Sequence, residues 1–381
     1  MGFATLRADL ADPATHRPEF WAPHLAGGRA VVNAAGLLTG SDNAFAAVHE
    51  AAPRAVYAAR EAGAPALLVS AVGIAADTPF ARWRRRGEAV AEAAGVTILR
   101  PGLVMADTSY GGTSLARALA ALPWVMPVVG RGTQRFNPIH AEDLAAVIAA
   151  CLETSPGPGA HEIGGPERIT QEGLLALMRG WLGLPPARVL HLPPRGAMAL
   201  GSVGDALRMG PVSRTTVAQL AEGVEADETA LLARIAPRPR PVSAFVTRRP
   251  AGTQDLWHAR LYLVRPLLRL VLAMLWLASG LLGLLLPPET FLPITAGSLP
   301  DAAAIALARS GGLADLALGA ALLRNWRPQL TGVLQLGLVG AYTLAFTVLA
   351  PAMWLLPLGG LLKNLPILAL ILVWMLLEDE R

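Results

Sequence analysis

Hydrophobic and polar positions follow two different patterns along the chain. Up to about residue 160, short apolar runs are separated by longer amphipathic stretches. The short runs predict strands at Ala4–Ala8, Ala30–Asn33, Ala66–Ser70 and Thr97–Arg100, and the longer stretches predict helices at Asn43–Glu61 and Phe80–Ala94. Because strands alternate with helices, we expect right-handed crossovers and a parallel sheet with helices on both faces.

The pattern changes after residue 160. HEIGGPERIT is followed by mostly helical segments opened by cap-like residues such as Thr170, which predicts a small helical lobe on the sheet. Residues 236–252 then read APRPRPVSAFVTRRPAG. Alternating prolines disfavour helix and favour extended chain. We therefore expect one α/β Rossmann-like domain at 1–235, with its lobe from about 160, and a Pro/Arg-rich juxtamembrane linker at 236–260.

Long apolar stretches dominate the rest of the chain. They run over Leu267–Leu286, Ala302–Leu323, Leu330–Ala350 and about Leu355–Leu377. Each has about the 20 residues that a helix needs to cross a bilayer. Eight charged residues lie in 267–377, although 16% of the whole chain is charged. Core helices of a soluble protein are the alternative, but four successive runs favour an all-α four-helix transmembrane bundle at 261–381.

Basic residues predict the orientation of these spans. Several arginines between Arg238 and Arg269 precede the first span, and Arg324 and Arg327 separate the second from the third. The loop between the first two spans carries only Glu289 and Asp301 as charged residues. Because arginines in short flanks stay on the cytoplasmic side, both termini are expected in the cytoplasm, with the spans in the inner membrane. The arginines before the first span would also attract anionic headgroups.

Polar residues inside the predicted spans are costly and usually face a partner or a cavity. They are Arg309, Asp315, Gln335, Tyr342, Lys363 and Asn364. We expect Asp315 to pair with Lys363. The pair would be either a structural ion pair between helices or part of a quinone- or proton-related site. Arg309 could instead extend its guanidinium toward the membrane surface.

Composition excludes several classes of function. A net charge of +4 is too modest to indicate nucleic-acid binding. Cys151 is the single cysteine, so no disulfide or cysteine-based metal site can form within the chain. No His/Glu spacing indicates a metal site, and the serine-hydrolase motif Gly-x-Ser-x-Gly is absent. Residues 1–30 lack the pattern of a cleavable signal peptide.

The apolar half resembles a known family. WLLPLGGLLKNLPILALIL (residues 354–372), with LADLALGAALL upstream, is similar to the DoxX-like four-helix membrane domain. The resemblance covers about 261–377. It implies a small bundle associated with membrane redox or stress functions. The expected partners are therefore the lipid bilayer and another membrane redox protein or quinone.

The first half resembles another family through six segments in a characteristic order. They read ATLRADLAD, AVVNAAG, ALLVSAVG, VTILRPGLV, RFNPIHAEDLAAVI and HEIGGPERIT. They resemble the NAD(P)-binding short-chain dehydrogenase/reductase superfamily, in its epimerase-like and complex I accessory-subunit branches. The resemblance implies that the following residues surround the dinucleotide: Asp9 and Leu10 at the adenine, Ala34, Ala35 and Gly36 along its length, Ser70 at the nicotinamide, and Arg100, Pro101 and Gly102 beside it. Structural roles are the alternative, with Asp9 as a helix cap and Pro101 as a strand end.

The chain departs from this family in two respects. First, it contains no G-x-G-x-x-G or G-x-x-G-x-x-G turn to hold a pyrophosphate, and it opens at what resembles the family's third strand. We expect a start further upstream, and loss of the phosphate site is the alternative. Second, Phe80 and Arg84 stand where the family has its Tyr-x-x-x-Lys acid/base pair. Lys363 is the single lysine, so no other frame restores the pair.

These departures leave two hypotheses. One is a membrane-anchored, NAD(P)-binding oxidoreductase- or epimerase-type domain facing the cytoplasm, without Tyr/Lys catalysis. The other is a noncatalytic scaffold or assembly module of a membrane redox complex. NAD or NADP is expected to bind a longer form, and no cofactor is expected for the chain as given. His140 lies close to Asp143 in the segment NPIHAED and is an alternative proton carrier. A helix-capping or structural role is favoured.

Overall fold

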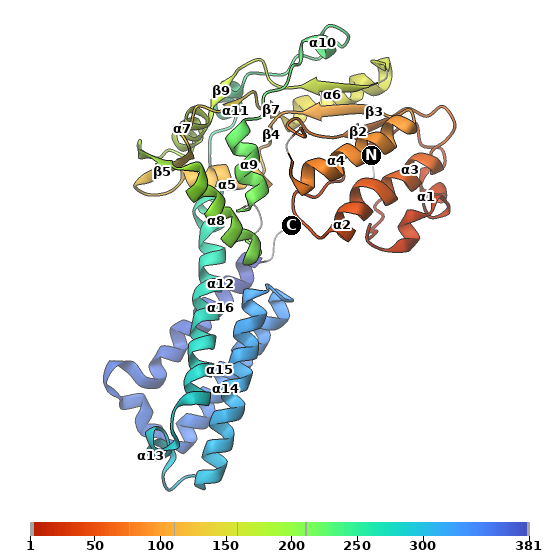
Figure 1. The fold of residues 1–381 in the computed structure, drawn as a ribbon. Coiled ribbons are helices and arrows are strands. Elements are labelled where there is room, and N and C mark those ends of the chain that lie inside the picture. The colour runs from red at the N-terminus through yellow and green to blue at the C-terminus, as the bar shows by residue number, and fades with distance from the viewer. Residues whose placement is uncertain (1–3, 76, 110, 158, 210–211, 379–381) are drawn as a thin grey trace. The chain divides into compact units, whose positions relative to one another are not determined.

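The chain folds into two compact units. The computed structural model describes residues 4–75, 77–109, 111–157, 159–209 and 212–378. The first unit comprises Met1–Asp205 and Gly210–Ala259, and the second comprises Ala206–Met209 and Arg260–Arg381. Figure 1 follows the chain through both units.

A parallel sheet forms the centre of the first unit. Its strands are β1 (Val31–Asn33), β2 (Ala66–Val69), β3 (Thr97–Pro101) and β8 (Ala160–Ile163), in the order β1-β2-β3-β8. Every adjacent pair is parallel, with Val32 opposite Leu67 and Leu68 opposite Ile98. The predicted parallel sheet and three of its strands are therefore confirmed.

Helices cover both faces of this sheet (Figure 1). The helices that cover it are α3 (Ala52–Ala59), α4 (Pro79–Ala93) and α6 (Ala141–Thr154). Successive strand residues point to opposite faces. Leu68 accordingly packs with Tyr57 of α3, whereas Leu67 and Leu99 pack with Val147 of α6. The apolar strands are buried on both sides, as parallel strands usually are.

Shorter elements complete the first unit. The paired strands are β4 (Val104–Met105) with β7 (Ile139–His140), β5 (Val125–Val129) with β10 (Arg188–Leu192), and β6 (Arg135–Phe136) with β9 (Ile169–Thr170). The remaining helices are η1 (Pro13–His16), α1 (Pro18–Leu25), α2 (Asp42–Ala46), η2 (Ala47–Ala51), α5 (Gly111–Ala120), α7 (Gln171–Trp181), α8 (Pro194–Ala206), α9 (Arg214–Glu222), α10 (Thr229–Leu232) and α11 (Val242–Arg248). The helix expected at Asn43–Glu61 is present as α2, η2 and α3, in which η2 is a π-helical turn.

Three expectations for this unit need correction. Ala4–Ala8 is not a strand, because its backbone joins no ladder of the described sheets. The residues from 160 onward do not all belong to a helical lobe, because β8 (Ala160–Ile163) is the fourth strand of the sheet. The linker is extended over 236–241 but helical in α11 and from Thr253 onward. A helix can begin directly after Pro241, which is tolerated at its first turn.

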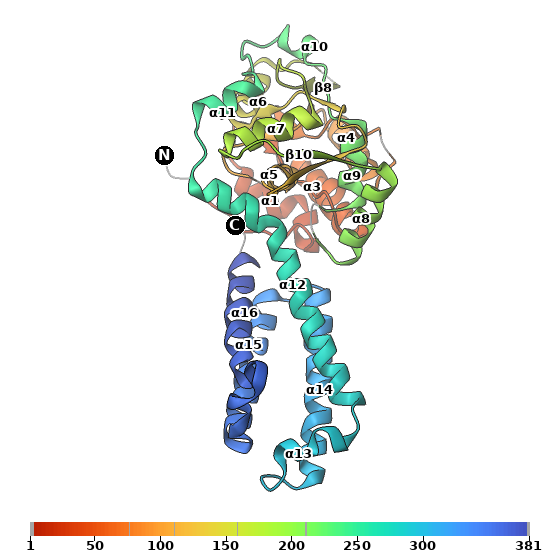
Figure 2. The same cartoon turned by 90° about the vertical axis from the view of Figure 1, so that its left-hand side faces the viewer.

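The second unit is helical. Its long helices are α12 (Thr253–Leu285), which starts in the first unit, α14 (Asp301–Leu323), α15 (Pro328–Leu349) and α16 (Asn364–Glu378). Short turns lie between them: η3 (Pro288–Thr290), α13 (Leu292–Thr295), η4 (Pro351–Leu355) and η5 (Pro357–Lys363). Figure 2 shows α12 beside α14 and α15 beside α16. Leu272, Leu322, Val339 and Trp374 meet in the core of this bundle.

Four segments are long and apolar enough to cross a membrane, as expected. They are Thr253–Leu285, Asp301–Leu323, Pro328–Leu349 and Gly359–Glu378. The fourth is less regular than its composition suggests. Its α-helix begins at Asn364, and the preceding residues form the 3₁₀ turns η4 and η5, which contain Pro351 and Pro357. These prolines favour short turns over a continuous helix.

Candidate functional site

The carboxyl ends of β1 and β2 form the candidate site. Ligands of open α/β sheets bind outside the carboxyl ends of the strands. Ala34, Ala35 and Gly36 follow β1 directly, and Ser70 follows β2. Helix α4 approaches the same ends, because Arg84 donates a hydrogen bond to the carbonyl of Val69. The structure thus brings four of the expected site residues together with Arg84.

Phe80 is a core residue at the start of α4. Thr78 caps this helix by accepting a hydrogen bond from the Ala81 backbone N–H at 3.1 Å. Phe80 is 6% exposed and packs in one cluster with Leu38 and Ile74. It occupies the position that the family resemblance gives to the acid/base tyrosine, yet a phenyl ring carries no exchangeable proton. This position therefore contributes packing and no proton transfer.

The Arg84 guanidinium fills the space at the strand ends. Its Nη1 donates to the carbonyl oxygen of Val69 at 3.1 Å and lies 3.5 Å from that of Ala35. Its Cζ lies 5.6 Å from the centre of the Phe80 ring. A Cβ added to Gly36 would lie 2.1 Å from Nη2, so the guanidinium rests directly on this glycine. Because Gly36 has no side chain, the Arg84 guanidinium can lie directly against its backbone.

His49 lies beside Arg84 and is neutral near pH 7. It is 3% exposed, and its ring stacks on Phe45 with centres 5.7 Å apart. Burial and the neighbouring Arg84 charge lower the pKa of His49 to about 4. His49 cannot act as a protonated acid near neutral pH, because its charged form is disfavoured in this environment.

Ser70 has a buried hydroxyl that finds no partner in the described part of the chain. The residue is 4% exposed, and its backbone N–H donates to the Leu99 carbonyl at 2.7 Å. Its Oγ accepts or donates no hydrogen bond among the described residues. A buried hydroxyl of this kind is costly unless something pairs with it. Ser70 is therefore the predicted site residue that remains able to bind a polar group.

Asp9 and Leu10 lie in a turn before the first helices. The Asp9 carboxylate accepts a hydrogen bond from the Ala11 backbone N–H at 2.9 Å, and the Leu10 carbonyl is 2.9 Å from His16 Nε2. Asp12, not Asp9, caps the following helix η1. The capping role considered for Asp9 is therefore wrong, and its contacts stabilise a local turn.

Arg100, Pro101 and Gly102 connect structural elements. Arg100 Nε donates to Glu88 of α4 at 2.9 Å, and this hydrogen bond raises the pKa of Arg100 above its usual value. Pro101 lies in β3 opposite Ile163, whose carbonyl accepts from the Gly102 N–H at 2.9 Å. In this structure the three residues join β3 to α4 and β8.

The Arg84 side chain occupies the strand ends. The space between Asn33, His49, Arg84 and Gly87 has no room for a water molecule. A group placed over Gly36 would have to displace the end of the Arg84 side chain.

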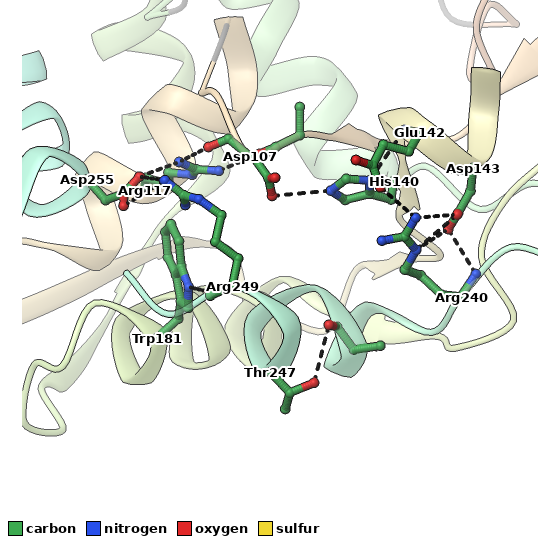
Figure 3. A network of polar contacts seen from close by, with 12 residues as sticks. Asp107, Arg117, His140, Glu142, Asp143, Trp181, Arg240, Thr247, Arg249 and Asp255 are labelled. Carbon is green, nitrogen blue, oxygen red and sulfur yellow. Dashed lines mark hydrogen bonds and ion pairs between the residues drawn. The ribbon is translucent and has the colours of Figure 1, made fainter. Parts of the chain in front are cut away.

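His140 belongs to a separate polar network of this unit (Figure 3). Its Nδ1 accepts a hydrogen bond from the Glu142 backbone N–H at 3.3 Å, which caps α6. With Nδ1 as the acceptor, the neutral ring carries its proton on Nε2, which lies 3.5 Å from the Asp107 carboxylate. Both ring nitrogens are therefore engaged, and the favoured capping role is confirmed.

The same network holds residues 240–255 against the rest of the first unit (Figure 3). Arg240 Nε donates to both carboxylate oxygens of Asp143, at 2.9 and 3.0 Å. Arg249 donates to both oxygens of Asp255 at 3.0 Å, and its backbone carbonyl accepts from the Trp181 indole at 2.7 Å. At least these two arginines bind carboxylates of the chain itself, although the sequence suggested lipid headgroups.

The charge pairing expected within the spans is wrong. Asp315 is 3% exposed, and its carboxylate accepts hydrogen bonds from Ser279 Oγ at 2.6 Å and from the Tyr342 hydroxyl at 2.8 Å. Lys363 is exposed and forms no ion pair with Asp315 among the described residues. Two neutral hydroxyls from α12 and α15 supply the partners because their helices pack against α14.

The other polar residues of the spans also have partners on neighbouring elements. Gln335 Oε1 accepts from the Trp276 indole at 2.8 Å, and Asn364 Nδ2 donates to Thr343 Oγ1 at 2.8 Å. Arg309 donates to the carbonyls of Gly283 and Leu286 at the end of α12, so it caps that helix. Sequence reasoning missed Trp276 and Ser279, although their three-residue spacing places both on one helix face.

Comparison with known proteins gives partial matches to this chain. Residues 273–372 match the sequence model of the DoxX-like family. The chain is 31% identical over 165 residues to subunit 9 of the mitochondrial NADH dehydrogenase (ubiquinone) 1 alpha subcomplex of Arabidopsis thaliana. This match spans 40% of the chain and 40% of that relative's length.

Solved structures of sugar-nucleotide enzymes match this chain at low sequence identity and low TM-score. The UDP-glucuronic acid 4-epimerase of Bacillus cereus, solved with UDP-glucuronic acid and NAD, has a TM-score of 0.44 and 15% identity over 68% of this chain and 81% of that chain. The dTDP-glucose 4,6-dehydratase of Streptomyces venezuelae, solved with NAD, has a TM-score of 0.47 and 15% identity over 67% and 79%. The chain thus combines a Rossmann-like parallel sheet with a helical region that matches the DoxX-like family model over residues 273–372.

Proposed function

We propose that the protein is a membrane-anchored module whose Rossmann-like unit has lost Tyr/Lys chemistry and serves as a noncatalytic scaffold. The observation that carries this proposal is the position of Arg84, which is bonded to Val69 and rests on Gly36 where the family resemblance places a dinucleotide. Four spans would anchor the unit in the inner membrane, with both termini in the cytoplasm.

The neighbouring side chains support a noncatalytic role. Phe80 has no proton to give, and His49 is neutral because its pKa is about 4. His140 uses Nδ1 for a helix cap and faces Asp107 with Nε2. General acid–base catalysis needs a group with a suitable pKa within reach of the substrate. Phe80 cannot titrate, and the pKa of His49 is too low for it to act as an acid near neutral pH.

The Arabidopsis relative indicates the kind of partner. It is named as a subunit of an NADH dehydrogenase. By this similarity, the partner of the scaffold would be a redox complex or a quinone-linked enzyme in the same membrane. The DoxX-like domain would hold the Rossmann-like unit close to that partner.

A second candidate is a redox function with NAD or NADP. The unpaired hydroxyl of Ser70 favours it, because this buried group could bind a carbonyl or amide of a ligand. This function would require Arg84 to leave the strand ends. The two candidates therefore differ in the behaviour of one side chain.

Restoring the family pair is expected to leave the protein without turnover. We predict that the double variant Phe80→Tyr, Arg84→Lys and the unaltered chain consume NADH and NADPH at the same background rate. The new phenol would replace a buried ring among Leu38 and Ile74, without a substrate beside it. The assay is cofactor oxidation by the full chain in nanodiscs, with quinone and sugar-nucleotide acceptors. A rise of about a hundredfold, as an acid/base group supplies, would favour the second candidate.

A further inference from the structure

We propose that the second unit binds the headgroup phosphate of an anionic phospholipid at three arginines, Arg208, Arg324 and Arg327. All three belong to this unit, although Arg208 comes from the segment Ala206–Met209 and is distant in sequence from the other two. The inference goes beyond the scaffold function and does not depend on it, because it concerns the membrane unit alone.

Arg324 and Arg327 lie in the turn between two candidate spans. Arg324 directly follows Asp301–Leu323, and Arg327 directly precedes Pro328–Leu349. The hydrocarbon core of a bilayer is only about 30 Å thick, so the ends of a span reach the headgroup region. Both arginines are exposed. Their guanidinium groups are therefore expected at the depth of the lipid headgroups.

Arg208 is held beside this turn by hydrogen bonds. Its Nη1 donates to the Arg324 backbone carbonyl at 3.0 Å. The backbone carbonyls of Leu207 and Arg208 accept hydrogen bonds from Nη2 of Arg269, which lies on α12 and is 2% exposed. A buried guanidinium thus fixes the segment that carries Arg208. The fold thereby adds a third arginine to the two in the turn.

The three arginines lack carboxylate partners within the described ranges. No ion pair between described residues includes Arg208, Arg324 or Arg327. Glu378, at the end of α16, accepts a hydrogen bond from the Trp374 indole at 3.1 Å. Among the residues that the structure describes, the group is therefore a concentration of positive charge, which attracts anions.

Phosphate is the anion that this group suits. A guanidinium is planar and always charged, and it can donate two parallel hydrogen bonds to the oxygens of one phosphate. Arg208 uses Nη1 for the Arg324 carbonyl, which leaves its remaining N–H groups for a ligand. Arg324 and Arg327 are exposed at the same turn and can turn toward the same phosphate.

Trp326 favours a lipid over a soluble phosphate. It lies between Arg324 and Arg327, is 47% exposed, and has its ring centre 5.5 Å from Arg327 Cζ. Tryptophan is enriched at membrane interfaces because its indole combines an apolar body with a polar N–H. Leu330 and Val333 are exposed on the following turns of α15. A phospholipid can therefore place its phosphate at the arginines and an acyl chain along α15, whereas free phosphate makes only the first contact.

Replacing two of the arginines should weaken the binding of an anionic phospholipid. Each arginine near an anionic lipid contributes about fivefold in affinity, so the double variant Arg324→Gln, Arg327→Asn should bind about 25-fold more weakly. Asparagine is chosen at 327 because φ is 39° there, a left-handed conformation that asparagine tolerates. The matched control is Arg82→Gln, Arg86→Gln on α4. It removes two exposed arginines from the first unit, and Arg86 also lies over a tryptophan ring, that of Trp83.

Native mass spectrometry of the full chain in detergent tests the proposal. The probes are phosphatidylglycerol and phosphatidylcholine with identical acyl chains, and the dissociation constant of the first bound lipid is measured. We expect the unaltered chain and the control variant to bind phosphatidylglycerol more tightly than phosphatidylcholine. The double variant Arg324→Gln, Arg327→Asn should lose most of this preference. Inorganic phosphate in excess should not displace phosphatidylglycerol, because it lacks acyl chains.

Four results would overturn the proposal. They are equal affinity of the unaltered chain for the two lipids, undiminished phosphatidylglycerol binding by the folded double variant, an equal loss in the control variant, and displacement of the lipid by inorganic phosphate. Thermal aggregation establishes that the variants are folded. If the double variant does not fold, Arg324→Gln alone decides, because φ is −82° at this residue and glutamine adopts it without strain. A loss of about fivefold is then expected, and an unchanged dissociation constant would contradict the site.

Discussion

Replacing Asp255 by alanine is expected to lower the free energy of unfolding of the first unit by about 3–5 kcal/mol. Asp255 is 6% exposed and accepts two hydrogen bonds from Arg249 and one, at 2.9 Å, from the Gly252 backbone N–H. Arg117, which is 5% exposed, lies 3.7 Å from the same carboxylate. Without Asp255, the buried Arg117 guanidinium would lose this carboxylate and keep hydrogen bonds to the backbone carbonyls of Ala106 and Asp107, which is the costly outcome.

Proteolysis of the full chain in detergent at increasing temperature measures this effect. Fragments of the first unit should appear in the variant at a temperature about 10 °C lower than in the unaltered chain. Asp77→Ala is the matched control, because its pair with Arg82 is exposed, with 89% and 52% of the two side chains accessible. Such a surface pair contributes at most about 1 kcal/mol. Equal shifts for the two variants would contradict the account.

Replacing Gly312 by leucine is expected to separate α12 from α14 and to destabilise the bundle by about 1–3 kcal/mol or more. The two helices meet through glycines. A Cβ at Gly312 would lie 2.9 Å from the Gly280 carbonyl oxygen and 3.2 Å from the Gly283 carbonyl carbon. Small residues let helix backbones approach closely inside membranes. A leucine side chain cannot occupy this contact unless the helices move apart.

Heating in detergent followed by size-exclusion chromatography checks this prediction. The Gly312→Leu variant should lose its monodisperse peak at a lower temperature than the unaltered chain. Gly337→Leu on α15 is the control, because a Cβ there would meet nothing within 4 Å. If both variants aggregate at the same temperature, the close contact between α12 and α14 does not stabilise the bundle.

The fold could be predicted where the apolar pattern was strong. β2 is a continuous apolar run and β3 buries Ile98 and Leu99, and the spans follow from length and composition. β8 was missed because it is an edge strand in which His161 and Glu162 are only partly buried. Its sequence therefore lacks the apolar run of a central strand.

The candidate site was predictable in its residue types but not in its contacts. The replacement of the acid/base pair by Phe80 and Arg84 can be seen in the sequence. The direction of the Arg84 side chain depends on the Val69 carbonyl and on Gly36, which are distant in sequence. Asp315 likewise accepts hydrogen bonds from two hydroxyls and forms no described ion pair with Lys363. The packing of the neighbouring helices places these hydroxyls beside it.

Equilibrium binding of NADH and NADPH to the full chain tests the central claim most directly. The claim is that Arg84 closes the strand ends of the Rossmann-like unit. Titration of the protein in nanodiscs, followed by cofactor fluorescence and calorimetry, should show no saturable binding up to millimolar cofactor. Saturable binding with a micromolar dissociation constant would contradict the claim and show that Arg84 gives way to a dinucleotide.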